Sequence, residues 1–132
     1  MDDDPAYTML LKEAILAQFP NADVITTDDG YEALLLIGER RPKVVLLDLK
    51  MPKVDGFQVL ELLKPRKKDN LMKVVVLSAY IDAPTRERLN KSVADDVLEK
   101  NRDVQDILHS LVVLLDESDQ IKNTRHTYST AV

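Results

Sequence analysis

Two short apolar runs constrain the fold of this chain more than any other feature. Residues 44–47 are Val-Val-Leu-Leu and lead into Asp48, and residues 74–77 are Val-Val-Val-Leu and lead into Ser78. Neither run alternates with polar residues, and each is too short for a helix. Such runs are typical of strands in a parallel sheet whose two faces are both covered. We therefore expect two buried parallel strands with Asp48 and Ser78 at their carboxyl ends.

Helical patterns around these runs set the fold class. Weaker strand patterns cover residues 22–27 and 95–99. Five helices are expected. One begins after a cap at Asp4 with Pro5 in its first turn, and another begins after a cap at Asn101. Two more cover residues 31–39 and 84–92, and the remaining one ends before Pro65. Alternating helices and strands indicate an α/β protein, an open doubly wound parallel sheet with helices on both faces.

Composition narrows the class of protein. Acidic residues outnumber basic ones by 23 to 18, which argues against non-specific nucleic-acid binding by this domain. The absence of cysteine excludes disulfides, thiolate catalysis and cysteine-bound metals, and agrees with a reducing, cytoplasmic compartment. No apolar run approaches the roughly 18 residues that span a membrane. The three glycines lie too far apart for a phosphate-binding glycine loop.

The length of 132 residues suits one domain. Apolar periodicity continues to about residue 116, so we expect a single domain over 1–116. Residues 117–132 are polar and aperiodic, and we expect a flexible tail or a linker stub there.

The expected strand ends bring reactive groups to one edge of the sheet, where ligands bind in open parallel sheets. Asp48, Ser78 and Lys100 should meet there, with the acidic cluster Asp2–Asp4 nearby. Crowded carboxylates repel unless a cation lies among them, so neutralising Asp48 is expected to leave the metal-free fold intact or slightly stabilised. Oxygen ligands suit Mg²⁺. Beside such a cation, Asp48 could attack a phosphoryl group while Lys100 and Ser78 bind its oxygens.

The segment from Val44 to Gly56 resembles the phosphoacceptor signature of two-component response-regulator receiver domains, a chemotaxis-regulator-like family. Met-Pro stands three and four places after Asp48, Ser78-Ala79 follows 30 places after Asp48, and Lys100 comes 22 places later. The resemblance covers about residues 2 to 116. It implies a flavodoxin-like sheet with the strand order 2-1-3-4-5.

The resemblance also implies a role for each site residue. Asp48 would be phosphorylated by a histidine kinase, Ser78 would be the switch hydroxyl, and Lys100 would bind the phosphoryl group. The implied Mg²⁺ ligands are Asp2, Asp3, Asp48 and the backbone carbonyl of Lys50, with Asp3 a direct ligand and Asp2 acting partly through water.

Three features depart from the family pattern. Val97 replaces the usual switch aromatic, and Asn101 replaces the proline that forms a cis peptide after the lysine. We expect a trans peptide here, because a cis bond before a non-proline residue costs about 2.5–4 kcal/mol. The apolar first strand that should precede Asp2 is missing from the sequence.

The missing strand would open a gap in the middle of the sheet. Three segments could fill it: an upstream segment, a strand from a partner chain, or residues 111–115. We favour the upstream segment, because residues 111–115 fit the stripe of the last helix.

The expected function is a phosphorylation-switched receiver that assists its own phosphorylation and dephosphorylation and is not an enzyme. One alternative is a receiver-like adaptor that acts without phosphorylation, as Val97 and Asn101 suggest. Another is a phosphatase of the haloacid-dehalogenase type, but that family needs a second aspartate where this chain has Lys50. Expected partners are a sensor histidine kinase or phosphotransfer protein and a downstream output domain or effector, with a homodimer allowed and no nucleic acid or membrane bound directly.

Overall fold

The computed structural model describes residues 4–50, 53–69, 72–101, 103–122 and 129–131, in which five helices and five strands are found. The strands are β1 (Asp23–Ile25), β2 (Val44–Asp48), β3 (Lys73–Ser78), β4 (Asp96–Glu99) and β5 (Ser129–Ala131). The helices are α1 (Pro5–Gln18), α2 (Gly30–Arg40), α3 (Gly56–Asp69), α4 (Ala83–Asn90) and α5 (Val104–Lys122). No helix within these ranges is long and apolar enough to cross a membrane.

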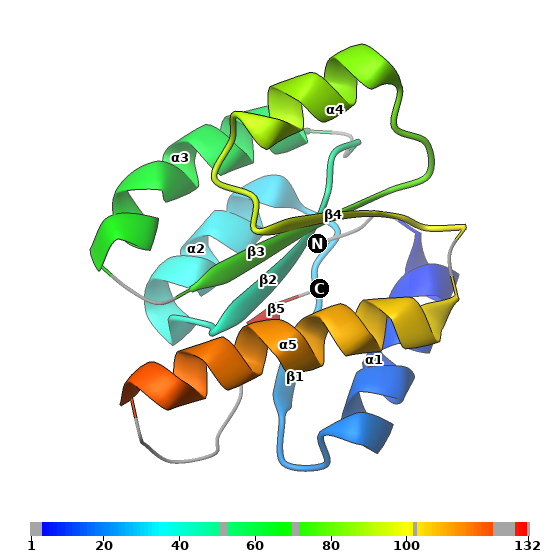
Figure 1. The fold of residues 1–132 in the computed structure, drawn as a ribbon, viewed down its shortest axis with the longest axis vertical. Coiled ribbons are helices and arrows are strands. Elements are labelled where there is room, and N and C mark those ends of the chain that lie inside the picture. The colour runs from blue at the N-terminus through cyan, green and yellow to red at the C-terminus, as the bar shows by residue number, and fades with distance from the viewer. Residues whose placement is uncertain (1–3, 51–52, 70–71, 102, 123–128, 132) are drawn as a thin grey trace.

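The strands form one parallel sheet in the order β1-β5-β2-β3-β4 (Figure 1). The two apolar runs become the neighbouring strands β2 and β3, as predicted. Their register pairs Val45 with Val74 and Asp48 with Leu77, so Ser78 lies one residue beyond the end of β2. β4 pairs with the other side of β3. The carboxyl ends of these three strands therefore meet at one edge.

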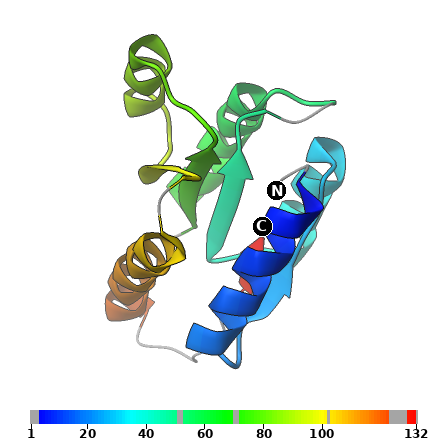
Figure 2. The same ribbon diagram turned by 90° about the vertical axis from the view of Figure 1, so that its right-hand side faces the viewer.

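β5 lies between β1 and β2, in the position of the first strand of the 2-1-3-4-5 order (Figures 1 and 2). Thr130 pairs with Val24 of β1 and with Val44 of β2, both in parallel. The free backbone groups of β1 and β2 explain why an extended segment is stable there. The structure thus fills the gap with residues 129–131, a segment outside the three that the sequence suggested.

The expectation for the end of the chain differs from the structure, whereas residues 111–115 lie in the last helix as their apolar stripe indicated. α5 continues to Lys122, and part of the expected tail over 117–132 is helix or strand. Residues 111–115 do not fill the gap, because Leu111 and Leu115 are buried on α5. Residues 116–122 contain no proline or glycine, so nothing in the local sequence ends the helix at the last residue of its apolar stripe.

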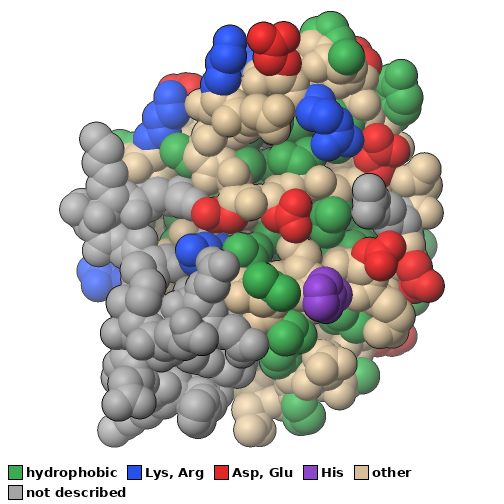
Figure 3. Space-filling model, in the orientation of Figure 1, with side chains coloured by type: hydrophobic (Ala, Val, Ile, Leu, Met, Phe, Trp, Pro, Cys, Tyr) green, Lys and Arg blue, Asp and Glu red, His purple; other side chains and the backbone are tan. Residues whose placement is uncertain are grey.

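The sheet ends at β4, which borders α5 on a mixed surface where acidic side chains lie near a histidine and hydrophobic groups (Figure 3). A hollow of about 400 Å³ between the two elements is lined by Asp96, His109 and Val113 among others. The Ser110 hydroxyl donates a hydrogen bond to Asp96 Oδ2 and joins α5 to β4.

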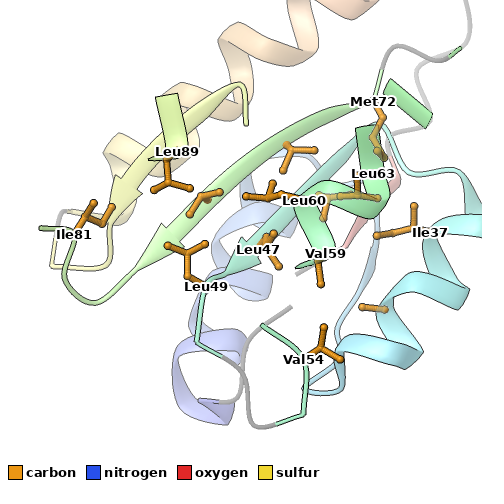
Figure 4. Packing of buried hydrophobic residues seen from close by; sticks show 14 residues of the cluster. Ile37, Leu47, Leu49, Val54, Val59, Leu60, Leu63, Met72, Ile81 and Leu89 are labelled. Carbon is orange, nitrogen blue, oxygen red and sulfur yellow. The ribbon is translucent and has the colours of Figure 1, made fainter. Parts of the chain in front are cut away.

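Alternate residues of β2 and β3 enter two different cores. Val45 and Leu47 pack with α2, α3 and α4 (Figure 4). Val44 and Leu46 pack with α1 and α5 on the opposite face. This explains the absence of polar alternation in both runs and confirms that helices cover both faces.

The helix boundaries follow local chemistry in most places. Asp4 caps α1 by accepting hydrogen bonds from the N–H groups of Ala6 and Tyr7, as predicted. The predicted end before Pro65 is wrong, because α3 runs through Pro65 to Asp69. Buried apolar residues on α3 outweigh the local cost of the proline. At α5 the carboxylate that accepts from the first turn is Asp103, not the predicted Asn101.

Candidate functional site

Asp48 is a buried carboxylate at the carboxyl end of β2, where only 5% of the residue is exposed. Its Oδ2 lies 3.0 Å from Lys100 Nζ, and the lysine side chain is 15% exposed. Its Oδ1 accepts a hydrogen bond of 3.1 Å from the N–H of Lys50. A buried carboxylate requires such partners, because burial of an unpaired charge is costly. The sequence-predicted residues Asp48 and Lys100 are therefore in direct contact.

Lys100 follows β4 and is tied to the end of β3. Its N–H donates a hydrogen bond of 2.8 Å to the carbonyl of Ser78. The Lys100 ammonium also lies 5.0 Å from the centre of the Tyr7 ring on α1. Contacts from β2, β3, the end of β4 and α1 thus hold the Lys100 amine beside the Asp48 carboxylate.

Ser78 is buried at the end of β3, on the strand next to Asp48. Its hydroxyl donates to the carbonyl of Tyr80 at 3.3 Å. The structure brings the backbone of Ser78 to Lys100, while the hydroxyl is engaged within its own loop. A hydroxyl can leave such a long bond by rotation about one side-chain torsion.

Gly56 closes the loop between β2 and α3 against the end of the strand. Its N–H donates to the carbonyl of Leu49 at 3.0 Å, and Lys50 and Asp55 form an isolated antiparallel bridge. A Cβ atom at position 56 would lie 2.5 Å from Leu49 Cα and 3.0 Å from the carbonyl oxygen of Asp48. Only glycine fits this close approach. The glycine of the sequence motif therefore sets the position of the loop after Asp48.

The proposed metal ligands lie partly outside the described residues. Asp2 and Asp3 are not within them, whereas Asp48 and Lys50 are. Within the part of the chain that the structure describes, no group of three acidic, histidine or cysteine residues could hold a metal ion. Asp48 and the Lys50 carbonyl offer oxygen atoms of the type that Mg²⁺ prefers, and Asp4 serves as the cap of α1.

The departures at Val97 and Asn101 have a visible local outcome. Val97 on β4 packs against the core formed with α2, α3 and α4. No peptide bond between described residues is cis, so the expectation of a trans bond between Lys100 and Asn101 is confirmed.

Sequence reasoning missed three residues near this edge. Tyr7 carried only a helical packing signal, so its contact with the lysine was not expected. Asp29 and Asp82 precede α2 and α4 and cap them, a position that the Asp-Gly-Tyr and Asp-Ala-Pro-Thr sequences could have indicated. Hydrogen bonds lower the pKa of both aspartates, chiefly from Lys53 to Asp29 and from Thr85 to Asp82.

Comparisons with known proteins agree with this geometry. The model of the response regulator receiver domain family matches residues 1–112. The DNA-binding dual master transcriptional regulator RpaA of Synechocystis sp. is 33% identical over 121 residues, which are 92% of this chain and 49% of that protein. The chain thus spans about half the length of such relatives.

Solved structures show the same fold. The receiver domain of the Francisella response regulator 1452 superposes with a TM-score of 0.75 at 28% identity, covering 88% of this chain and 93% of that one. The response regulator TrrA of Thermotoga maritima, solved with Mg²⁺ and BeF, superposes with a TM-score of 0.72 at 29% identity, covering 86% and 93%.

Proposed function

Because this chain belongs to the response regulator receiver domain family, we propose that it is a phosphorylation-switched signalling module in which Asp48 accepts a phosphoryl group from a histidine kinase or phosphotransfer protein. The observation that carries the proposal is the buried pair of Asp48 and Lys100, joined at 3.0 Å. Such a pair would supply a carboxylate nucleophile and a cation for phosphoryl oxygens at one strand edge.

The chemistry requires one bond to form as another breaks. A carboxylate oxygen of Asp48 bonds to phosphorus while the P–N bond of the partner's phosphohistidine breaks, which leaves an aspartyl phosphate and a histidine. Later attack by water at phosphorus releases inorganic phosphate and restores the carboxylate. Since both steps occur on the domain's own side chain, the domain assists its own modification and is not an enzyme with a separate substrate.

Lys100 and Ser78 would bind the phosphoryl group. Lys100 would turn from the Asp48 carboxylate to a phosphoryl oxygen, because the phosphoryl group is attached to the carboxylate that the lysine already contacts. The Ser78 hydroxyl would leave the Tyr80 carbonyl, bonded at 3.3 Å, and donate to another phosphoryl oxygen. Movement of this hydroxyl would couple phosphorylation of Asp48 to a structural change at the protein surface.

Mg²⁺ fits the oxygen atoms available at this edge. Asp48 and the carbonyl of Lys50 would hold it together with Asp2 and Asp3. A bound Mg²⁺ would offset negative charge on the phosphoryl oxygens. The structure of TrrA contains Mg²⁺ and BeF, and this supports the same cofactor here.

The partners follow from this chemistry. The phosphoryl donor is a sensor histidine kinase or a phosphotransfer protein in the cytoplasm. Because the chain spans about half of a relative described as a DNA-binding regulator, we propose that the signal passes to an output domain or a separate effector protein. The net charge of −5 disfavours direct nucleic-acid binding by the receiver itself.

Incubation of the purified protein with Mg²⁺ and acetyl phosphate tests the proposal. We expect the mass of one phosphoryl group to be added at Asp48, to disappear slowly in buffer, and to be absent from Asp48→Asn. Steady release of phosphate from many substrates without an adduct would indicate a phosphatase. The absence of both adduct and turnover would favour an adaptor that acts without phosphorylation.

A further inference from the structure

The ring of Tyr7 lies beside the ammonium group that pairs with Asp48. The ring centre is 5.0 Å from Lys100 Nζ, and the same nitrogen is 3.0 Å from Asp48 Oδ2. A cation within about 6 Å of a ring centre is attracted by the negative face of the ring. The attraction is stronger where water is largely excluded, and the lysine side chain is only 15% exposed. The amine thus has an anionic and an aromatic neighbour.

The backbone of Lys100 does not by itself fix the amine. The N–H of Lys100 is anchored on the Ser78 carbonyl at 2.8 Å, at the start of a flexible four-carbon stem. Fixing such a stem costs rotamer entropy, so a contact close to the amine is needed to hold it in one place. The Tyr7 ring provides such a contact from α1, in addition to the ion pair that the amine makes with Asp48.

An aromatic ring suits the two states that the proposed function requires of the lysine. The ammonium pairs with the Asp48 carboxylate before phosphorylation and with a phosphoryl oxygen afterwards. A ring carries no net charge and attracts a cation over a broad face, so it retains the ammonium without competing with either anion. A carboxylate at position 7 would compete with both.

We propose that Tyr7 is a positioning residue whose ring holds the Lys100 ammonium at Asp48. The kinetic consequence rests on the proposed function, whereas the contact itself can be measured without a phosphoryl donor.

The first test compares variants that remove or keep the ring. With acetyl phosphate and saturating Mg²⁺, Tyr7→Leu should slow phosphorylation of Asp48 by about fivefold or more, while Tyr7→Phe stays within about twofold of the parent. In a Lys100→Met background, Tyr7→Leu should slow the reaction no further. Equal slowing by leucine and phenylalanine, or an undiminished effect without the lysine, would overturn the inference.

The second test is a double-mutant cycle on urea denaturation with no donor present. Tyr7→Leu and Lys100→Met should change the denaturation midpoint non-additively, whereas Tyr7→Leu and Lys53→Met, the matched control pair, should be additive. If this coupling is present but Asp48 takes no phosphoryl group, the contact stands and only the proposed function fails. If the coupling with Lys100→Met is absent, the inference about Tyr7 is overturned.

Discussion

Single residues at the strand edge are tied together by one buried ion pair. Asp48 and Lys100 are both largely removed from water and lie 3.0 Å apart. Breaking a buried pair leaves the remaining charge without its partner. Crowding among the acidic residues argued that neutralising Asp48 would leave the fold unharmed or stabilised. The observed pair argues the reverse, because Lys100 would lose its carboxylate.

We therefore expect Asp48→Asn to lower the free energy of unfolding by about 1–2 kcal/mol, less than for a fully buried pair because the ammonium can move toward solvent. Urea denaturation in metal-free buffer measures the change. Lys100→Met in the same chain should remove part of the penalty, so the double variant should lose less than the sum of the single variants. An Asp48→Asn protein that melts above the parent would restore the crowding argument.

Gly56 controls the position of the loop after Asp48. A methyl group there would meet Leu49 Cα at 2.5 Å, so the backbone must shift. We expect Gly56→Ala to destabilise the fold by about 1–3 kcal/mol and to slow phosphorylation of Asp48. Gly38 is the matched control, since alanine in the last turn of α2 gains helix propensity. If both substitutions stabilise the protein equally, the close approach at Gly56 is not a constraint.

Individual elements differ in how well the sequence predicts them. β2 and β3 could be predicted because burial on both faces removes polar residues from the strand. The third helix end could not, because the penalty for Pro65 is local whereas the packing that overrides it is tertiary. β5 carries no apolar pattern of its own, and only the space between β1 and β2 makes residues 129–131 a strand.

In the candidate site, too, some residues could be predicted from local sequence and others only from tertiary packing. Asp48 and Lys100 stand at motif spacing and are found together. Tyr7 has the spacing of a packed helical residue, and nothing local to it indicates a lysine 93 positions later. A contact between α1 and the residue after β4 depends on how the helix packs against the sheet, which the local sequence around Tyr7 does not show.

The cap of α2 should make stability depend on pH. The hydrogen bond from Lys53 to Asp29, together with those from the N–H groups of Tyr31 and Glu32, holds the pKa of Asp29 below the ordinary aspartate value of about 3.9. A carboxyl whose pKa is lower in the folded state stabilises the fold above its unfolded pKa, and this contribution disappears as pH falls through the folded pKa.

We expect the free energy of unfolding to fall more steeply from about pH 5 to pH 3 in the parent than in Asp29→Asn. Asparagine keeps a good cap but cannot titrate, so the comparison isolates the charge. Denaturation curves collected across this range provide the measurement. Parallel pH profiles for the two proteins would contradict the role of Asp29.

β5 can be tested through its backbone. Thr130 pairs with Val24 and Val44, and proline at this position removes an N–H group from the middle of the sheet. We expect Thr130→Pro to destabilise the protein by about 3 kcal/mol or more. Thr130→Val keeps the N–H group and has at least the same strand preference, so it serves as the control. Identical melting temperatures for the proline variant and the parent would mean that β5 does not support the sheet.

The molecule as a whole links the site to its surface through β3 and β4. Ser78 and Val97 lie on these strands, which are in parallel register. A two-state element responds only as far as its contacts differ between states. Val97 is a small side chain packed on the core, so it has little contact area to exchange.

We expect phosphorylation, or beryllofluoride with Mg²⁺, to change amide chemical shifts around Asp48 more than those on α4 and β4. Backbone NMR spectra recorded with and without the ligand measure both regions. In a Val97→Tyr variant the changes on α4 and β4 should increase, because a large ring can move between two environments. Changes of equal size in the two regions of the parent would contradict this view of the switch.

The place of β5 also determines the order in which the protein can fold as it is made. The ribosome completes β1, β2, β3 and β4 before it adds residues 129–131, the strand that joins β1 to the others. Pairings between distant parts of a chain form late because the intervening loop must close first. A chain truncated before residue 129 would still contain β2, β3 and β4, which pair with one another, whereas β1 would lack the strand that joins it to them.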